Sequence, residues 1–583
     1  MASHAEPANK ASDWTRDIVR APLRDPDRVM RLARLGTMHP SRLSFLRSLI
    51  RRMGREQWRI ACRRFDIGAN ERGEAVYTVD TPQGRYSFVV FAQLIPEHAR
   101  TDRVIAERWD YTFALTEGEP DATHMARLRA NVPRQEAGRV TSRDLILARG
   151  NKSVRLFDAM VAALARGRQP DVAEIATVGY LMRTTAVYGN GKFGLADYER
   201  VRAATPFDRP FAAQMLAVYL ARVFSLDLVD HMAWLHGGSA AARLSAPLRR
   251  AIGVGNATGL GMAPFITSHP ELVNAWVTAR ETAIARVKGV PAAAGVRTRR
   301  FRDLLARTIT HADQWWTPDP DQHAAIVALR AELREIAGAL TPASADNPLA
   351  QPHPWQALAT WVSRRFSLET QELVHSLILE PYPELVDDLE TAMGASEGAR
   401  VRAAETLGAL ARRIARGYAW ALAIDPDDPG ESHYFWYRAT EKEEPRLGAR
   451  HTDPGSDREM PIGVGVAVAR LYRDLRALDA DALAEPVGQF LMRHPEHRAL
   501  IARIQTLADK PYAEVRDNLL HRDMRPVDLL RFKLAFFGAV RFDPKSDRWT
   551  RITLFSGTPL PADLADPRID CDDSFAPIWP ETP

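Results

Sequence analysis

Two glycine-rich segments contain the residue types best suited to bind a small anion. The first runs from Arg183 to Gly194 and combines three glycines with Arg183, Thr184 and Lys192. Glycine lets backbone N–H groups turn toward one point, where they and nearby cations bind phosphate or carboxylate groups. The spacing differs from a Walker A loop, in which Ser or Thr directly follows Gly-Lys. We expect an anion-binding loop here; a glycine-rich link between two helices, with its charges in water, is an equally good interpretation.

The second segment, Gly253–Gly261, superficially resembles a dinucleotide-binding loop. Such a loop needs a strand before it and a helix that opens at it. Residues 249–252 make a poor strand, and Pro264 follows too soon for a long helix. We therefore expect a backbone-lined binding loop that offers Asn256 and Thr258. Tight packing of helices through glycine explains the same composition.

A third candidate segment, residues 431–446, is rich in aromatic and charged side chains. On a strand, alternate residues would form two faces, so that rings such as His433 line a pocket with charged walls. Glu441 could then act as a base, while Arg438 and Arg446 could hold an anion. The favoured interpretation is an interface strand followed by a solvated charge run, because charge runs usually lie at the surface.

The three segments together favour a metabolic enzyme that acts on a small anionic substrate of the phosphorylated, carboxylate or nucleotide type. Arg183 and Lys192 would hold the anion and Asn256 would orient it. Tyr188 or Glu441 would move the proton. The reaction class and any organic cofactor have no signature in the sequence.

The sequence gives little sign of a metal site. Four potential ligands fall within ten residues: Asp227, Asp230, His231 and His236. The two histidines are five positions apart, about 140° around a helix, so they cannot converge on one ion as i, i+4 ligands do. The chain has two cysteines, Cys62 and Cys571, which suits a reducing cytoplasm. We predict no metal and no disulfide framework.

The basic residues are concentrated near the N-terminus. Residues 28–64 contain eleven arginines and one acidic residue, Glu56. Within this range Ser41 can cap an amphipathic helix whose apolar stripe includes Leu46 and Leu49. A helix docked by its apolar face is the simplest interpretation. The alternative function is a nucleic-acid-associated protein or interaction scaffold that uses residues 28–64, since arginines can track phosphates.

Composition favours a packed protein of several domains. The chain has 583 residues, of which 46% are hydrophobic and 26% charged. A chain of this length normally folds into two to four domains, because a single hydrophobic core does not grow that large. Every long apolar run, such as residues 211–228, is interrupted by Arg, Gln or Asp, so no transmembrane segment is expected. Residues 1–10 lack the apolar core of a secretory signal, so we expect a cytoplasmic protein.

The elements that must position these residues are mainly helical. Alternation predicts a hairpin over residues 75–80 and 85–93, a strand over 109–116, and a late hairpin over 539–543 and 549–555. Helical periodicity predicts helices near 142–166, 171–187, 209–235 and 271–288. The predicted fold class is mainly α (α+β), a large helical body with small antiparallel β-sheet elements near the N-terminus and in the C-terminal half.

Prolines and composition predict five sequence segments. They are a disordered tail over 1–12, a basic helix with a small sheet over 13–140, a helical domain with the two glycine-rich loops over 141–340, a Pro-rich linker over 341–356, and a second helical domain with a β-hairpin over 357–583.

Overall fold

The computed structural model describes most of the chain in a series of ranges. They are residues 21–93, 109–134, 141–185, 206–259, 262–315, 320–394, 399–428, 434–438, 443–447, 464–517, 519, 526–544 and 549–566. Four of the predicted site residues, Tyr188, Lys192, His433 and Glu441, lie outside these described residues.

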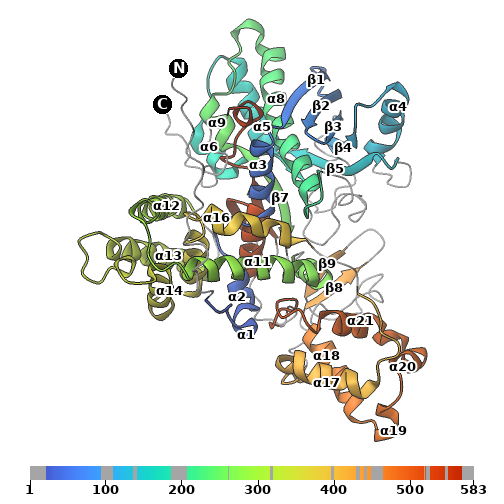
Figure 1. Ribbon diagram of the computed structural model, residues 1–583. Coiled ribbons are helices and arrows are strands. Elements are labelled where there is room, and N and C mark those ends of the chain that lie inside the picture. The colour runs from blue at the N-terminus through green and yellow to red at the C-terminus, as the bar shows by residue number, and fades with distance from the viewer. Residues whose placement is uncertain are drawn as a thin grey trace, which may run out of the picture.

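In the described chain, nine strands form one mixed sheet in the order β1-β2-β3-β4-β5-β6-β7-β11-β10 (Figure 1). The strands are β1 Arg59–Ile67, β2 Gly73–Thr81, β3 Gly84–Ala92, β4 Tyr111–Glu117, β5 Asp144–Lys152, β6 Tyr180–Thr184, β7 Gly253–Gly259, β10 Arg541–Pro544 and β11 Trp549–Leu554. Neighbours pair antiparallel except β6 and β7, which are parallel. Strands β8 (Tyr434–Arg438) and β9 (Glu443–Leu447) form a separate antiparallel pair.

This sheet overturns the predicted fold class. The hairpins at β2–β3 and β10–β11 are confirmed, but they belong to one large sheet rather than to small isolated elements. The predicted helix at 142–166 is strand β5 followed by helix α5, and that at 171–187 is helix α6 followed by β6. Strands β5 and β6 are mostly buried, so their apolar residues form short continuous runs, which periodicity cannot separate from a buried helix.

The expected binding loop at Gly253–Gly261 is also corrected, because residues 253–259 are strand β7. A Cβ on Gly255 would lie 2.8 Å from the ring of Tyr180, and one on Gly253 would lie 2.4 Å from the carbonyl oxygen of Leu554. The glycines therefore let neighbouring strands and a ring approach the backbone closely. Glycine here marks a crowded strand, whereas the sequence pattern indicated a loop.

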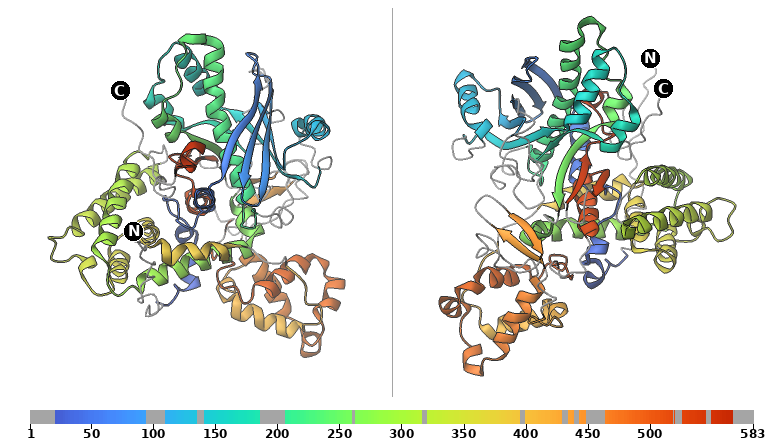
Figure 2. Two further views of the ribbon diagram at one scale, coloured as in Figure 1. Left: turned by 45° about the horizontal axis from the view of Figure 1, so that its top comes forward. Right: turned by 180° about the vertical axis from the view of Figure 1, so that it is seen from behind.

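Helices cover both faces of the sheet. Figure 2 shows α8 (Ala212–Gly237) and α4 (Ala122–Asn131) on opposite sides of strands β1–β4. Leu128 of α4 packs on Val76, Val89 and Leu147 in a small apolar cluster. Helix α8 contacts β4–β7 and helices α3 and α5 inside the main hydrophobic core. Further helices of this region are α1 Pro26–Val29, α2 Leu32–Leu35, α3 Phe45–Arg55, α5 Val154–Ala165, α6 Val172–Val178 and α9 Ala246–Ala251.

Helix α8 confirms the helix predicted at 209–235 and is the core helix of the fold. Among the described residues, the segment Ala212–Ala240 alone is long and apolar enough to cross a membrane by length and composition. In this structure 94% of its apolar window is buried inside the protein. Its hydrophobicity is therefore accounted for by packing in the protein interior.

A layer of helices extends the main core away from the sheet, as Figure 1 shows for α12, α13 and α14. These helices are α10 Met262–Ser268, α11 Pro270–Lys288, α12 Gly295–Asp313, α13 Pro320–Ala339, α14 Pro354–Arg365, α15 Leu368–Leu377 and α16 Pro383–Val386. Helix α11 confirms the helix predicted at 271–288. The segment 341–356 connects α13 to α14 with Pro348 and Leu349 buried. The division of the chain at this segment stays a prediction.

A second hydrophobic core lies among helices near the C-terminal part of the chain. Its helices are α17 Leu407–Gly417, α18 Val464–Arg476, α19 Ala480–Leu483, α20 Val487–Arg493 and α21 Arg498–Leu507. Arg503 of α21 joins this core to the rest of the protein, with Nε 2.6 Å from a carboxylate oxygen of Glu514 and Nη1 donating to the carbonyl of Thr267.

The Arg-rich segment contributes helix α3, whose N-cap is Ser44 and not the predicted Ser41. Several of its arginines are buried beside carboxylates from the segment after α15. The pairs are Arg42 with Asp387, Arg47 with Glu380, and Arg51 with Glu390. These internal ion pairs give no support to the alternative in which residues 28–64 bind nucleic acid. They explain instead why an arginine-rich helix belongs in a protein core, since buried charges require partners.

Candidate functional site

Strand β6 ends at Thr184, beside the middle of its parallel neighbour β7. Their register pairs Tyr180 with Gly253 and Arg183 with Gly255, and the two strands are the parallel neighbours among the described strands. Parallel strands place their carboxyl ends at the same edge, which is where open α/β sheets bind ligands. The chain leaves β6 directly into the glycine-rich sequence 186–194. This edge is the natural place to look for the predicted anion site.

Two of the predicted residues meet at this edge. The Asn256 side chain is fully buried, and its Nδ2 donates to the carbonyl oxygen of Thr184 at 2.8 Å. The Thr184 hydroxyl donates to the carbonyl of Arg149 at 3.2 Å. Asn256 therefore links the end of β6 to the middle of β7 through its amide, and this fixes the direction in which its Oδ1 points.

A lysine that the sequence analysis did not single out completes the contact. Lys533 is 0% exposed, and its Nζ donates to Asn256 Oδ1 at 2.6 Å. It is the last residue of helix α22 (Pro526–Lys533), and a π-helical turn, Leu534–Gly538, follows it at once. Turns of this kind are rare and often occur at functional sites. We call Thr184, Asn256 and Lys533, together with Arg183 on the opposite face of the same strand end, the edge cluster.

The electrostatic setting of Lys533 differs from that of an ordinary buried cation. Within the described residues, Lys533 makes no ion pair with a carboxylate, and its hydrogen-bond partner Asn256 is neutral. Burial therefore lowers the pKa of Lys533 well below its usual value, because a charged ammonium would lose its hydration. A lysine in this state favours the neutral amine, which can accept a proton or attack a carbonyl carbon.

Arg183 supplies a cation at the same strand end, on the face of the sheet opposite to Asn256, because side chains alternate along a strand. Its backbone pairs with Asn151 of β5 and Gly255 of β7, so its position is set by strands on both sides. The side chain is half-buried, and nothing in the described part of the chain forms a hydrogen bond or ion pair with its guanidinium. A guanidinium without an internal partner can bind a carboxylate or phosphate through two parallel hydrogen bonds.

The other predicted residues lie elsewhere in the fold. Thr258 is in β7, where its backbone pairs with Thr550 of β11. Arg438 and Arg446 belong to the separate β8–β9 sheet, in which Arg438 is opposite Glu443. The segment 434–438 is the strand that the aromatic pattern predicted.

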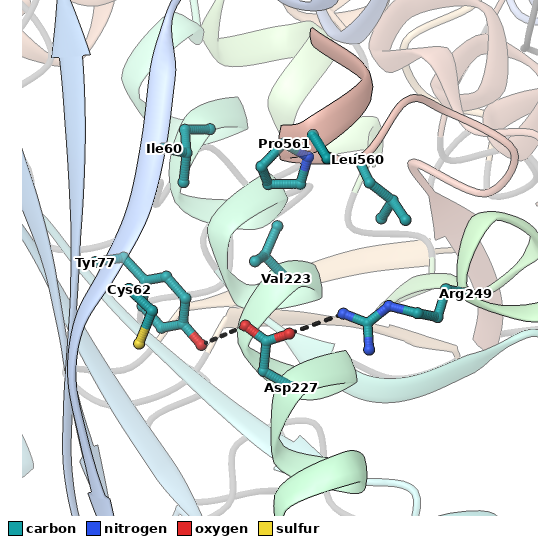
Figure 3. A pocket seen from close by; sticks show the side chains of 9 residues that line it. Ile60, Cys62, Tyr77, Val223, Asp227, Arg249, Leu560 and Pro561 are labelled. Atoms are coloured by element: carbon teal, nitrogen blue, oxygen red, sulfur yellow. Dashed lines mark hydrogen bonds and ion pairs between the residues drawn. The ribbon is translucent and has the colours of Figure 1, made fainter. Parts of the chain in front are cut away.

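A cavity of about 270 Å³ lies near the other end of β7, beside α9, and Figure 3 shows it from close by. It is lined by side chains from β1, β2, α8, α9 and the start of helix α23 (Pro561–Leu564): Ile60, Cys62, Tyr77, Val223, Asp227, Arg249, Leu560, Pro561 and Ala562.

A row of hydrogen bonds crosses the polar end of this cavity. The Tyr77 hydroxyl donates to Asp227 Oδ2 at 2.9 Å, and Arg249 Nη2 donates to Asp227 Oδ1 at 2.8 Å. Arg249 also pairs with Asp230 at 2.7 Å. Burial and the charge of Asp227 raise the pKa of Tyr77 well above its usual value, and the same two causes raise the pKa of Cys62. Both groups are therefore neutral hydrogen-bonding groups at neutral pH.

The sequence did not reveal Lys533 at the edge cluster, or the pairing of Asp227 and Asp230 with Arg249 at the cavity, for different reasons. Lys533 has no local motif, and it lies 277 positions from Asn256. Asp227 and Asp230 were noticed as potential metal ligands, and their i, i+3 spacing does place them on one face of α8. Their partner in the structure is Arg249. Two acidic residues on one face of a buried helix therefore indicated a nearby basic side chain.

No described residues gather three His, Cys, Asp or Glu side chains in a group that could hold a metal ion. The assignment of a function therefore rests on the geometry of the edge cluster and of the cavity. Comparison of the chain with models of protein families, with curated proteins and with solved structures finds no match in any of the three.

Proposed function

We propose that the protein is a cytoplasmic metabolic enzyme that acts on a small anionic substrate at the edge cluster. The observation that carries the proposal is Lys533, a fully buried amine held by the neutral side chain of Asn256 and by no carboxylate among the residues that the structure describes. Burial of a cation without a counter-ion costs several kcal/mol of folding free energy. Groups kept in such a state cluster at functional sites.

The residues of the cluster divide the work between binding and proton transfer. Arg183 holds the carboxylate or phosphate of the substrate at the end of β6, because its guanidinium has no partner in the described chain. Asn256 holds the Lys533 amine in place and is itself fixed by the Thr184 carbonyl. Lys533 then takes a proton from the substrate as a general base, since a lowered pKa leaves its amine free to accept one.

The first experiment is native mass spectrometry of the purified protein, followed by denaturation and identification of any small molecule released. A phosphorylated or carboxylate compound gives the substrate class, and it then serves as the ligand in binding and turnover assays. Three variants are compared with the unmodified protein: Arg183→Ala, Lys533→Met and, as a control, Arg59→Ala on the exposed part of strand β1.

The roles predict a split between binding and turnover. Arg183→Ala should weaken binding of the anion at least about tenfold, as expected for loss of a charge-assisted contact. Lys533→Met should retain binding and lower kcat by about 10²- to 10⁴-fold, the usual contribution of a positioned base. Arg59→Ala should behave as the unmodified protein. Unchanged binding in Arg183→Ala together with unchanged kcat in Lys533→Met, in folded proteins, contradicts the proposal.

A further inference from the structure

The first turn of helix α8 has hydrogen-bond donors that the described part of the chain leaves unused. Its N-cap is Phe211, which has no side-chain oxygen, whereas N-caps are usually Ser, Thr, Asp or Asn. The backbone N–H groups of Ala213 and Gln214 bond to no acceptor among the described residues. Such groups bind anions at many helix N-termini, because the helix dipole adds to their partial charges.

The side chain of Gln214 is a second and independent observation. It is 1% exposed, and no acceptor in the described ranges receives a hydrogen bond from its Nε2. A helical side chain extends back over the turn before it, so this carboxamide lies over the first turn of α8. A buried donor without a partner costs stability, and in a native protein it calls for a partner such as water, an ion or a ligand.

This end of α8 lies on the same face of the sheet as Lys533. Side chains alternate along a strand, so Asn256 shares a face of β7 with Val254, which is buried in the main core with α8. The ring centroids of Phe211 and Phe537 are 5.4 Å apart, and Phe537 belongs to the π-helical turn that begins directly after Lys533. The N-terminus of α8 therefore adjoins the segment that holds the amine.

The helix and the strand bring Gln214 and Asn256 to a similar level. Arg222 Nε donates to the carbonyl of Ile252 at 2.8 Å, directly before β7. From this contact Gln214 is eight residues back along the helix, which is ~12 Å at about 1.5 Å per residue. Asn256 is four residues forward along the strand, which is ~13 Å at about 3.3 Å per residue. Both paths lead toward Lys533.

The acidic groups beside this end of α8 are paired with arginines. Asp208 is 2.6 Å from Arg52, and Glu390 pairs with Arg51 and Arg209. Because these guanidinium groups are already engaged, the available donors are two backbone N–H groups and one carboxamide. Three neutral donors suit the single charge of a carboxylate, whereas proteins usually bind phosphate with arginine or lysine.

We infer that the N-terminus of α8 is a carboxylate subsite, in which the backbone N–H groups of Ala213 and Gln214 and the Gln214 carboxamide bind a carboxylate of the substrate. This subsite rests on the proposed function and extends it: besides the group that Arg183 holds on the other face of the sheet, the substrate carries a carboxylate on the face of Lys533. The substrate is then a small carboxylic acid with a second anionic group.

Acetate is the probe for the subsite, and acetamide is its neutral counterpart of the same shape. Thermal unfolding of the full-length protein is followed with increasing sodium acetate, with sodium chloride added to keep the ionic strength constant, and separately with acetamide. A ligand that binds the folded state raises the midpoint of unfolding. Acetate should raise the midpoint saturably by about 2 °C or more, while acetamide should change it by less than about 0.5 °C.

Two substitutions of Gln214 test its role. Gln214→Leu should weaken the effect of acetate at least about tenfold. Without acetate its midpoint should be unchanged or higher, because the substitution removes a buried donor that has no partner. Gln214→Glu keeps the shape, and its charge suits a helix N-terminus but repels an anion, so this variant should fold and lose the effect. Gln489→Leu, an exposed control in α20, should behave as the unmodified protein.

Arg183→Ala and Lys533→Met should both keep the acetate effect that depends on Gln214. Failure of the proposed function and failure of the subsite are therefore distinguishable. An equal response to acetate and acetamide in the unmodified protein overturns the inference, and so does an acetate effect that survives in Gln214→Glu.

Discussion

Arg24 and Lys533 are both basic residues with buried side chains, but their partners differ completely. Arg24 donates to both oxygens of Glu281, at 2.7 and 2.9 Å, and to both oxygens of Glu372, at 2.8 and 3.0 Å. Lys533 donates to the neutral amide of Asn256. In the first region the fold supplies two carboxylates for one guanidinium. In the second, no carboxylate from the described ranges pairs with the amine.

The difference separates a charge with a structural role from a group for which we propose a functional role. Burial alone would raise the pKa of Glu281 and of Glu372, but the nearby Arg24 outweighs it and lowers both. Around Lys533, burial acts unopposed and lowers the pKa of the amine. The first arrangement stabilises charges that the fold uses as contacts between α11, α15 and the N-terminal segment. The second maintains a reactive amine, at a cost in stability.

Removal of Arg24 should have the largest effect on stability. Arg24→Ala leaves Glu281 and Glu372 buried with fewer partners, and loss of one member of a buried ion pair costs about 3–5 kcal/mol. The free energy of unfolding is measured with urea at neutral pH. The control is Arg31→Ala, whose pair with Asp517 is partly exposed and should be worth less than about 1 kcal/mol. Equal losses in the two variants would show that the Arg24 cluster is not a structural centre.

The sequence was informative about this network only in part. It showed the concentration of arginines in residues 28–64. It did not show the partners of Arg42, Arg47 and Arg51, because Asp387, Glu380 and Glu390 lie more than 300 positions away in the chain. An arginine-rich amphipathic helix looks the same whether its charges face phosphates or buried carboxylates. Only the tertiary fold distinguishes the two environments.

The second prediction concerns alkaline pH and uses the difference between the unmodified protein and Lys533→Met. An unfolded chain has a lysine pKa near 10.4, and burial lowers the pKa of Lys533 in the folded state. Between these two pKa values the unfolded chain binds the extra proton, so the free energy of unfolding rises with pH. The rise is about 1.4 kcal/mol per pH unit within that interval.

Lys533→Met lacks this titration, while all other groups titrate alike in both proteins. The stability of the unmodified protein relative to the variant should therefore increase from pH 7 to pH 10. Urea unfolding at each pH gives the difference directly. A difference that stays constant over this range would mean that Lys533 keeps an ordinary pKa, which would remove the basis for its role as a base.

The edge cluster was partly accessible from the sequence. Arg183, Thr184 and Asn256 were found because glycine-rich stretches interrupt long apolar patterns, and the structure brings Thr184 and Asn256 into contact. The sheet that holds them was missed because buried strands show no alternation and β7 is rich in glycine. Alternation did predict the β2–β3 hairpin, where a short turn links two neighbouring strands. Strands that are neighbours in the sequence can be predicted from a local pattern of residues. The contact of Lys533 with Asn256 cannot, because the two residues are 277 positions apart.

The third prediction tests whether close packing between β7 and Tyr180 contributes to the stability of the protein. Gly255→Ala places a methyl group 2.8 Å from the Tyr180 ring, and overpacking of this kind costs about 1–3 kcal/mol. Gly295→Ala is the matched control: no atom lies within 4 Å of the added methyl group at the start of α12, so helix propensity should stabilise the protein by about 0.5–1 kcal/mol. The midpoints of thermal unfolding should therefore fall for Gly255→Ala and rise for Gly295→Ala. A stabilising Gly255→Ala would contradict the close approach of β7 and Tyr180.

The smallest effect, and the sharpest comparison, comes from two double-mutant cycles. One combines Lys533→Met with Asn256→Leu, and the other combines Arg24→Ala with Glu372→Gln. At pH 9, a hydrogen bond between a neutral amine and an amide should give a coupling energy of about 0.5–1.5 kcal/mol. The buried ion pair should give a larger coupling, about 2–3 kcal/mol, because both groups are charged and desolvated.

Each cycle removes the same contact in both orders, so the cost of creating a cavity largely cancels in the coupling energy. The coupling energy of Lys533 with Asn256 can then be compared directly with that of Arg24 with Glu372. If the Lys533–Asn256 coupling equals or exceeds that of Arg24 with Glu372, the amine is charged in the folded protein and Asn256 acts as its main stabilising ligand. A small coupling leaves the lysine as a group that the fold holds in place without neutralising it, which is the state that a buried base requires.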